Sequence, residues 1–383
     1  MKPVTQNVLI KSYADCVAGN MRTDYGFSLV EIMVGLVIGL FGIIIITQIF
    51  ALAEGQKRTT TSGADAQTNG NIALYSIERD VRQAGYGLNL TSLGCSTNTS
   101  LNGITTTALE RAPYANGIMI MAPVIIIDGG TDANGDSLPD TLRTLYSTNA
   151  VSSLPQTLQA NLAWNATQAA IGSTFNMANG DMVVFFETGG IKSCVLAQVT
   201  GAPVSATTFN FNGGSWNNSA IVNTATGGLG YGTGASVFDF GSLAFRRYNI
   251  DLANNNLRFS EVTSNGSTTI VAAGEIVNLQ AQYGKDTNND GILDTWDTVT
   301  PGLLPPAGAG TNAQWQQIIA VRIAILARSG QYEKPTTAGV CTATTVAPAW
   351  TGGTMAVPGG LPSCYRYKVF ETVVPLRNVL WGI

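Results

Sequence analysis

The 383-residue sequence contains no histidine, and charged residues make up only 11% of it. The side chain that most often serves as a general base is therefore missing. No Gly-x-Ser-x-Gly nucleophile elbow and no Walker loop occurs. A glycine-rich stretch from Gly227 has no following helical pattern, so it indicates a loop rather than a phosphate-binding turn. We expect a protein that is not an enzyme; a membrane-anchored hydrolase is the alternative that an activity screen would test.

Positive charge is also scarce, with 20 Lys and Arg against 24 Asp and Glu and a net charge of −4. No run of basic residues is present. A nucleic-acid partner requires a basic surface that neutralises phosphates, so none is expected.

One long apolar run extends from Phe27 to Ala53, and Glu31 is its only ionisable residue. The run exceeds the roughly 20 residues that an α-helix needs to cross a bilayer core. A carboxylate in such a segment is costly, which makes it a functional hypothesis by default. The alternatives are an ordinary anchor and a secretory signal peptide, which would be cleaved after the run, at small residues. We expect a retained membrane-spanning helix with a carboxylate near one end.

The residues around this carboxylate resemble the type IV pilin superfamily, whose signature is a Gly, a Phe and then a Glu at the fifth mature position. Gly26, Phe27 and Glu31 match it position by position. The resemblance implies that a prepilin peptidase cuts between Gly26 and Phe27 and methylates the new amino group of Phe27. It also implies that Glu31 helps to dock the subunit in a helical filament. Gly35 and Gly39, at small-xxx-small spacing, would let helices approach closely.

The predicted parts are a leader (1–26), a transmembrane half-helix (27–53), an amphipathic half-helix (54–86) and a globular head (87–383). Residues 21–26 alone make a typical short leader, so translation starts at Met21 unless the leader is naturally long. In the second half-helix, apolar residues at helical spacing include Ile77 and Val81. Polar residues take the other positions: Glu78, Arg79, Asp80 and Arg82. Gly55, Gly63 and Gly70 weaken the helix, and Gly85 and Gly87 end it.

The head has the pattern of a β-rich domain. The predicted strands are 117–127, 182–188, 191–199, 243–250, 256–262, 268–273, 276–283, 318–328 and 366–374. Gly189-Gly190 predicts a hairpin between two of them. The fold class is therefore α+β, with one long N-terminal helix packed on a mainly antiparallel sheet.

The second resemblance lies in the head, to the PilW family of minor pilins. Its residues are Glu275–Gln280, Tyr283-Gly284, Trp296, Trp315, Ala320–Ala324 and Pro375–Asn378, together with Ile77–Gly87 after the first helix. The middle of the chain, about residues 100 to 270, matches little of that pattern.

Five cysteines are present, and Cys16 lies before the predicted cleavage. The mature part holds Cys95, Cys194, Cys341 and Cys364, an even number on the side of an oxidising compartment. Four cysteines permit three pairings. Cys341 with Cys364 closes a short loop, and Cys95 would then pair with Cys194.

The richest local chemistry is the loop of residues 286–297, which has EF-hand spacing. Its oxygen donors would be Asp286, Asn288, Asp290, the Ile292 carbonyl, Asp294 and Asp297. Gly291 takes the position of the sharp turn, while Asp297 replaces the usual Glu and has a shorter reach. The alternative is an Asn/Asp/Gly turn without metal. We expect a weak Ca²⁺ site here.

A second loop repeats part of this spacing with Asp132, Asn134, Asp136 and Asp140. Ser137 replaces the Gly, and Arg143 occupies the place of the final acid, where a cation opposes Ca²⁺. A solvated acidic turn is the favoured interpretation, and calcium is the weaker one.

Together the two resemblances imply a minor pilin of a type IV pilus, made in the bacterial inner membrane and then built into a surface filament, near its tip. The implied partners are other minor and major pilins, the prepilin peptidase and the inner-membrane assembly machinery. A type II secretion pseudopilin is an alternative. A calcium-dependent surface adhesin is another, compatible with the first.

Overall fold

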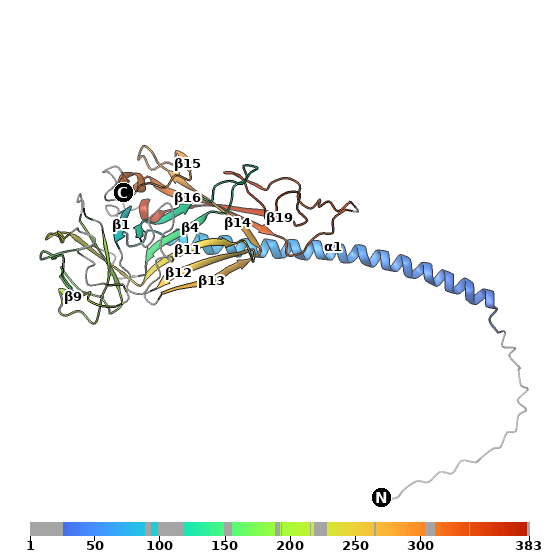
Figure 1. The fold of residues 1–383 in the computed structure, drawn as a ribbon, viewed down its shortest axis with the longest axis horizontal. Coiled ribbons are helices and arrows are strands. Elements are labelled where there is room, and N and C mark those ends of the chain that lie inside the picture. Colours follow the sequence, from blue (N-terminus) through green and yellow to red (C-terminus); the bar gives the residue numbers. More distant parts are fainter. Residues whose placement is uncertain are drawn as a thin grey trace, which may run out of the picture. The chain divides into compact units, whose positions relative to one another are not determined.

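The computed structural model describes residues 26–88, 93–98, 118–148, 155–187, 192, 194–214, 216–217, 228–263, 266–302, 311–336 and 338–380. The predicted leader before Gly26 and the predicted Gly189-Gly190 hairpin lie outside these residues. The chain forms two compact units, Met1–Lys57 and Arg58–Ile383. Helix α1 (Leu29–Gln83) belongs to both, so each part is described by itself (Figure 1).

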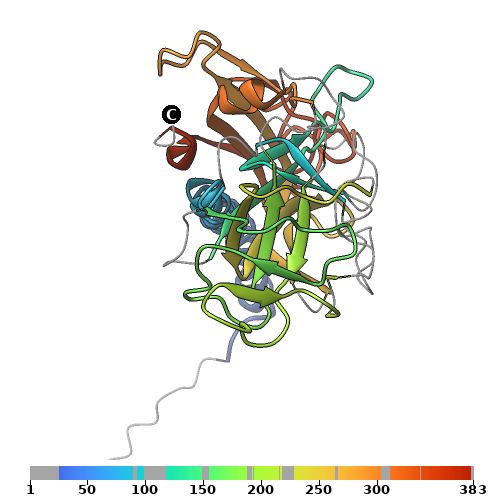
Figure 2. The ribbon, with the colours of Figure 1, turned by 90° about the vertical axis from the view of Figure 1, so that its left-hand side faces the viewer.

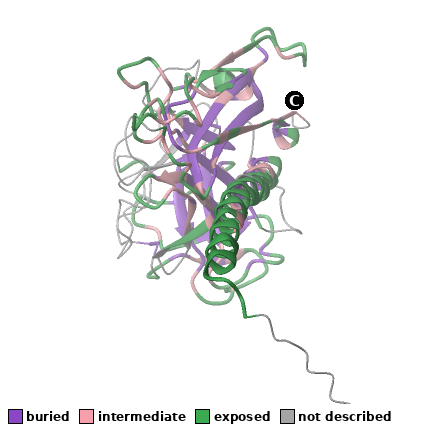
Figure 3. Cartoon of the chain, turned by 90° about the vertical axis from the view of Figure 1, so that its right-hand side faces the viewer, coloured by how far each residue is buried: buried purple, intermediate pink, exposed green. Residues whose placement is uncertain are grey.

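In the first unit, α1 exposes almost all of its apolar side chains, among them Leu29, Ile38 and Ile46. Its most apolar window has a mean hydropathy of 2.8 and no buried residue. Figure 3 shows the N-terminal part of the helix in the colour of exposed residues. Within the described ranges it is the one helix whose length and composition suit a membrane crossing. Lipid is the surroundings in which such a surface is stable.

In the second unit, α1 packs on the head through residues at three- to seven-residue spacing. Ala66, Ala73, Ile77, Val81 and Ala84 are buried in the main core. Their spacing puts them on one face of the helix, as predicted for Ile77 and Val81. Ile72, another apolar residue of this stretch, is 49% exposed and lies off that face. The helix ends at Gln83, just before glycines whose φ angles are positive.

Gly70 has a packing role that the sequence did not indicate. A Cβ atom at this position would lie 2.2 Å from a ring atom of Phe370. The missing side chain therefore lets the helix lie against the sheet, and the weakened helix propensity is the cost of that approach.

Two large antiparallel sheets form the body of the head. The five-stranded sheet has the order β13 (Gly266–Gly274), β12 (Asn256–Thr263), β11 (Leu243–Asp251), β4 (Thr141–Ser147) and β3 (Val124–Ile127). The four-stranded sheet has the order β15 (Thr295–Asp297), β14 (Ile276–Lys285), β16 (Ile318–Arg328) and β19 (Tyr367–Pro375). Side chains of α1 and of both sheets share the main core.

Residues 155–241, termed the insert, form a β unit with a core of their own. Its sheet has the order β5 (Gln156–Thr157), β10 (Ser236–Gly241), β7 (Met182–Phe186) and β8 (Val195–Gln198). Beside it, β6 (Gln168–Ala170) pairs with β9 (Thr208–Asn210). Phe185 contacts Phe209, Phe211 and Tyr231 at the centre of this core. The green strands of the insert lie toward the viewer in Figure 2.

The remaining elements are short. They are β1 (Cys95–Asn98) paired with β2 (Ile118–Met121), β17 (Ala349–Trp350) paired with β18 (Gly353–Thr354), α3 (Thr311–Gln316) and α4 (Arg377–Leu380).

The α+β class with a mainly antiparallel head is confirmed, and β16 has the predicted bounds. The predicted strand 117–127 is wrong as one element, because the chain leaves the ladder between β2 and β3, at Pro123, which has no N–H to donate. The sequence also missed β4 and β10, in which charged residues interrupt the apolar pattern.

Candidate functional site

The first candidate site is the start of α1. Gly26, Phe27 and Ser28 precede the helix, which begins at Leu29. Ser28 Oγ accepts a hydrogen bond of 3.3 Å from the Val30 N–H, and the Ser28 N–H donates one of 3.3 Å to Glu31 Oε2. The predicted cleavage position thus lies in non-helical backbone. Glu31 contacts its own helix start here, so its expected docking in a filament stays a prediction.

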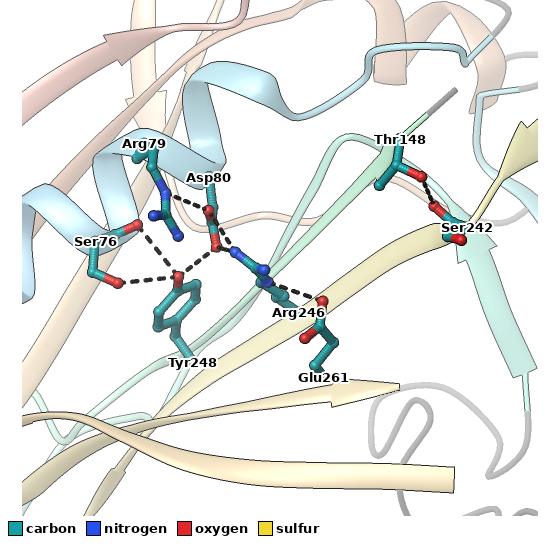
Figure 4. A network of polar contacts seen from close by, with 8 residues as sticks. All are labelled: Ser76, Arg79, Asp80, Thr148, Ser242, Arg246, Tyr248 and Glu261. Carbon is teal, nitrogen blue, oxygen red and sulfur yellow. Dashed lines mark hydrogen bonds and ion pairs between the residues drawn. The ribbon is translucent and has the colours of Figure 1, made fainter. Parts of the chain in front are cut away.

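The second candidate site fastens α1 to the head through Asp80. This carboxylate is fully buried, although the sequence placed it on the polar side of the helix. Arg246 Nη1 on β11 donates to both of its oxygens at 3.0 Å, and the Tyr248 hydroxyl donates to Oδ2 at 2.5 Å. Figure 4 shows these contacts together with Arg79, whose Nε lies 3.2 Å from Asp80 Oδ1.

The charges of this Asp80 network stabilise one another. Burial lowers the pKa of Arg246, but the hydrogen bond and charge of Asp80 outweigh it and raise that pKa above its ordinary value. Burial raises the pKa of Tyr248, and the Asp80 charge raises it further. Glu261 Oε1 lies 3.3 Å from Arg246 Nε on the outer side. The network therefore favours a charged Arg246 and a neutral Tyr248 where β11 meets α1.

A third contact ties the end of α1 to the C-terminal part of the chain. Asn378 Nδ2, on α4, donates to the carbonyls of Gln83 and Ala84 at 3.1 Å each. The last carbonyls of a helix have no partner within it, so this amide acts as a C-terminal cap. Asn378 belongs to the Pro375–Asn378 motif singled out in the sequence, and the cap gives that motif a physical role.

The third candidate is the loop 286–297. Asp286 is buried and accepts hydrogen bonds from the N–H groups of Asp290 and Gly291. Asn288 and Asp290 also accept N–H groups of this loop. The donors at its first three ligand positions therefore lie together, as the spacing predicts.

Two other predicted ligands of this loop are held elsewhere. Asp297 forms an ion pair with Lys285 at 2.7 Å, where the sequence expected a metal ligand. Asp294 accepts from the N–H and the hydroxyl of Thr287 at 2.7 Å, which lowers its pKa. No group of three acidic, His or Cys side chains suited to a metal occurs among the described residues. In this arrangement the loop does not fit a complete calcium site, and calcium binding stays a prediction.

The side chains of the second acidic loop, residues 132–140, do not converge on one metal position. Asp132 Oδ1 accepts from the N–H groups of Asn134 and Asp136 at 2.8 and 3.0 Å. Asp140 is buried instead and accepts from the N–H groups of Gly129 and Ala281. Burial raises the pKa of Asp140 to about 7, although both hydrogen bonds oppose that rise. Asp140 therefore joins this loop to β14 rather than facing a shared ligand.

Arg143, expected at the end of that loop, is a core residue of β4. Its Nη2 donates to the Ile120 carbonyl at 2.8 Å, and its guanidinium lies 4.9 Å from the centre of the Phe245 ring. Burial lowers its pKa to about 9.

Both expected disulfides are formed in the structure. Cys95 is joined to Cys194, which connects β1 to the insert, and Cys341 is joined to Cys364 near β19. The first bridge crosses 99 residues of sequence and the second 23.

Two family models match parts of the chain. The family model described as Type IV Pilus-assembly protein W matches residues 244–378, and the prokaryotic N-terminal methylation motif matches residues 21–47. No curated protein matches the chain. Among solved structures, a type IV-like pilin from Thermus thermophilus is 14% identical over 53% of this chain and 87% of its own, with a TM-score of 0.22.

The two family matches fall on the sites described above. The methylation motif includes Gly26, Phe27 and Glu31. The PilW match includes Arg246, which binds Asp80, and Asn378, which caps α1, while the insert lies outside both matches. Together the two matches support a type IV minor pilin of the PilW family, with an N-terminus of the kind that prepilin peptidase cleaves and methylates.

Proposed function

We propose that this minor pilin has a structural and not an enzymatic role, initiating filament assembly with other pilins and then remaining near the tip. It would wait in the inner membrane as a single-pass protein, contact the assembly machinery there, and move to the cell surface within the filament. The observation that carries the proposal is the pairing of an exposed apolar half-helix with a head fastened to the same helix by Asp80.

The insert supports the display part of the proposal. It lies outside both family matches, it has its own core, and the Cys95–Cys194 disulfide attaches it to the head. Its described surface exposes the large apolar side chains Trp164, Phe175 and Leu229. These features suit a module that carries its own recognition surface.

Incorporation into filaments tests this function. Filaments sheared from cells are expected to contain the wild-type protein, and Glu31→Ala is expected to lower that amount while the protein stays in the membrane fraction. Insertion survives because removing a charge favours lipid. A wild-type protein absent from the filament fraction, in cells that make filaments, would contradict the proposal.

Calcium binding by the loop 286–297 is a second, separate proposal, and it would suit a surface adhesin. It rests on Asp286, Asn288 and Asp290, which already lie together in one turn. Calcium takes six to eight oxygen ligands, so the ion would have to draw Asp294 from Thr287 and Asp297 from Lys285. These exchanges would weaken the site.

A further inference from the structure

Helix α1 begins with two reciprocal hydrogen bonds between Ser28 and the first turn. The Ser28 hydroxyl accepts from Val30 N–H, and Glu31 accepts from Ser28 N–H. This resembles a capping box: the Ser before the helix accepts from the second helical N–H group, and the Glu three residues later accepts from the Ser N–H group. The first N–H groups of a helix have no partner within it, so the box determines where the helix can begin.

We propose that Ser28 is a positioning residue for prepilin cleavage, because its capping box fixes the start of α1 at Leu29. The Gly26–Phe27 peptide bond then remains outside the helix, where a peptidase can bind the backbone on both sides of it. This inference rests on the cleavage between Gly26 and Phe27. It adds a residue two positions beyond the cut whose role is to hold the backbone and not to react.

In this apolar sequence, a cap is needed to fix the residue at which the helix begins. The residues from Leu29 onward form one continuous helix, and in an apolar medium each unpaired N–H is especially costly. Without a cap, the helix lowers this cost by extending toward Phe27 and Gly26, which would place the cleaved bond inside a hydrogen-bonded turn. The Ser28 hydroxyl pairs one of these N–H groups, so the helix gains less free energy by extending beyond Leu29.

The same geometry separates two roles of Glu31. In this structure its carboxylate is a hydrogen-bond acceptor for its own chain. A glutamine accepts the same bond, since either Glu or Gln serves at this position of a capping box. Glu31→Gln therefore keeps the cap and removes the charge, whereas Glu31→Ala removes both.

The test is a time course of leader removal from the full-length precursor in membranes that contain prepilin peptidase. Ser28→Ala is expected to slow cleavage about fivefold, the factor that corresponds to a cap worth about 1 kcal/mol. Ser28→Thr, which keeps a capping hydroxyl, is expected to restore the rate. Glu31→Gln is expected to be cleaved at the wild-type rate but to enter filaments poorly. Thr47→Ala, which removes another hydroxyl of α1, serves as the matched control and is expected to change nothing.

Several outcomes would overturn the inference. Ser28→Ala cleaved as fast as wild type would show that the cap does not position the bond. Ser28→Thr as slow as Ser28→Ala would show that the peptidase reads the serine itself. A Ser28→Ala precursor missing from the membrane fraction would assign the loss to insertion. A wild-type precursor that is never cleaved would instead contradict the processing of this pilin altogether, so the two failures are distinguishable.

Discussion

Asp80 of α1 and Arg246 of β11 are 166 residues apart in the sequence and are joined by two hydrogen bonds of 3.0 Å. The carboxylate is fully buried, whereas the arginine side chain keeps 19% of its surface exposed. Tyr248, two residues along the same strand, donates to the same carboxylate. The junction between helix and head therefore combines this polar network with the buried apolar residues of α1.

Breaking this junction is expected to destabilise the head strongly. Asp80→Ala leaves the Arg246 cation without its main partner, and removal of one member of a buried pair costs about 3 kcal/mol or more. The free energy of unfolding of the full-length protein in detergent micelles, from a denaturant titration, is the measurement. Arg82→Ala is the control, because it removes an exposed pair with Glu78 worth about 0.3–0.5 kcal/mol. Equal losses for both variants would mean that the Asp80 network does not hold the helix.

Two glycines of α1 are expected to respond in opposite directions to alanine. At Gly63 a new Cβ meets nothing within 4 Å, so Gly63→Ala should stabilise by up to about 1 kcal/mol through helix propensity. At Gly70 a Cβ would lie 2.2 Å from the Phe370 ring, and overpacking costs about 1–3 kcal/mol. Denaturant titration of both variants tests the close approach of helix and sheet. A gain at Gly70 as large as that at Gly63 would show that the ring moves freely.

Stability is expected to fall as pH rises from about 4 to about 7, through Asp140. Its folded-state pKa of about 7 lies above the ordinary value of 3.8, so the folded protein binds the proton more tightly than the unfolded chain. The contribution of Asp140 to the free energy of unfolding is fully present below pH 3.8 and is lost as the pH rises past 7. The total loss is up to about 4 kcal/mol. Asp140→Asn should flatten this part of the stability profile, measured by denaturant titration between pH 4 and 8. If the free energy of unfolding of Asp140→Asn varied with pH as in the wild type, another group would be responsible for this dependence.

Both disulfides are expected in exported protein. Peptide mapping without reductant should recover the linked pairs Cys95–Cys194 and Cys341–Cys364. In the chain-entropy model a loop of about 20 residues contributes about 3 kcal/mol and a loop of about 100 residues about 4.7 kcal/mol. Cys95→Ser with Cys194→Ser should therefore lower the melting temperature more than the other double variant. Four free thiols in exported protein would contradict the pairing and the oxidising compartment.

Calcium is expected to raise the melting temperature of the protein relative to chelator. A ligand that binds only the folded state stabilises it by about 2.7 kcal/mol at a hundredfold excess over its dissociation constant. Asp290→Ala should erase most of the difference and Asp136→Ala little of it. Lys285→Ala releases Asp297 and should strengthen binding. Calorimetry with no calcium binding at millimolar concentration would leave the loop as a hydrogen-bonded acidic turn.

The features predicted well from sequence are those with a local physical cause. The apolar run, the glycines after Gln83 and the bounds of β16 each follow from neighbouring residues. The spacing of Asp286, Asn288 and Asp290 likewise predicted the turn in which they lie. Local pattern therefore carried most of the fold class.

The features that sequence missed depend on partners far along the chain. Asp80 looked like a surface residue among charged neighbours, because its partners Arg246 and Tyr248 become visible only when β11 packs on α1. From the sequence, Arg143 was expected to be a positively charged residue of the acidic loop. In the structure it is a buried residue of β4 whose guanidinium lies over the Phe245 ring. Asp297 had the right spacing for a ligand, yet the antiparallel pairing of β14 with β15 brings Lys285 beside it. Long-range pairing decides each of these cases.

The N-terminal residue of the protein recovered from purified filaments tests the central claim most directly. Mass spectrometry of its N-terminal peptide is expected to show a chain that begins at Phe27 with a methyl group on the α-amino nitrogen. A chain that begins beyond Ile46, or one that still carries residues before Phe27, would contradict the assignment as a processed minor pilin.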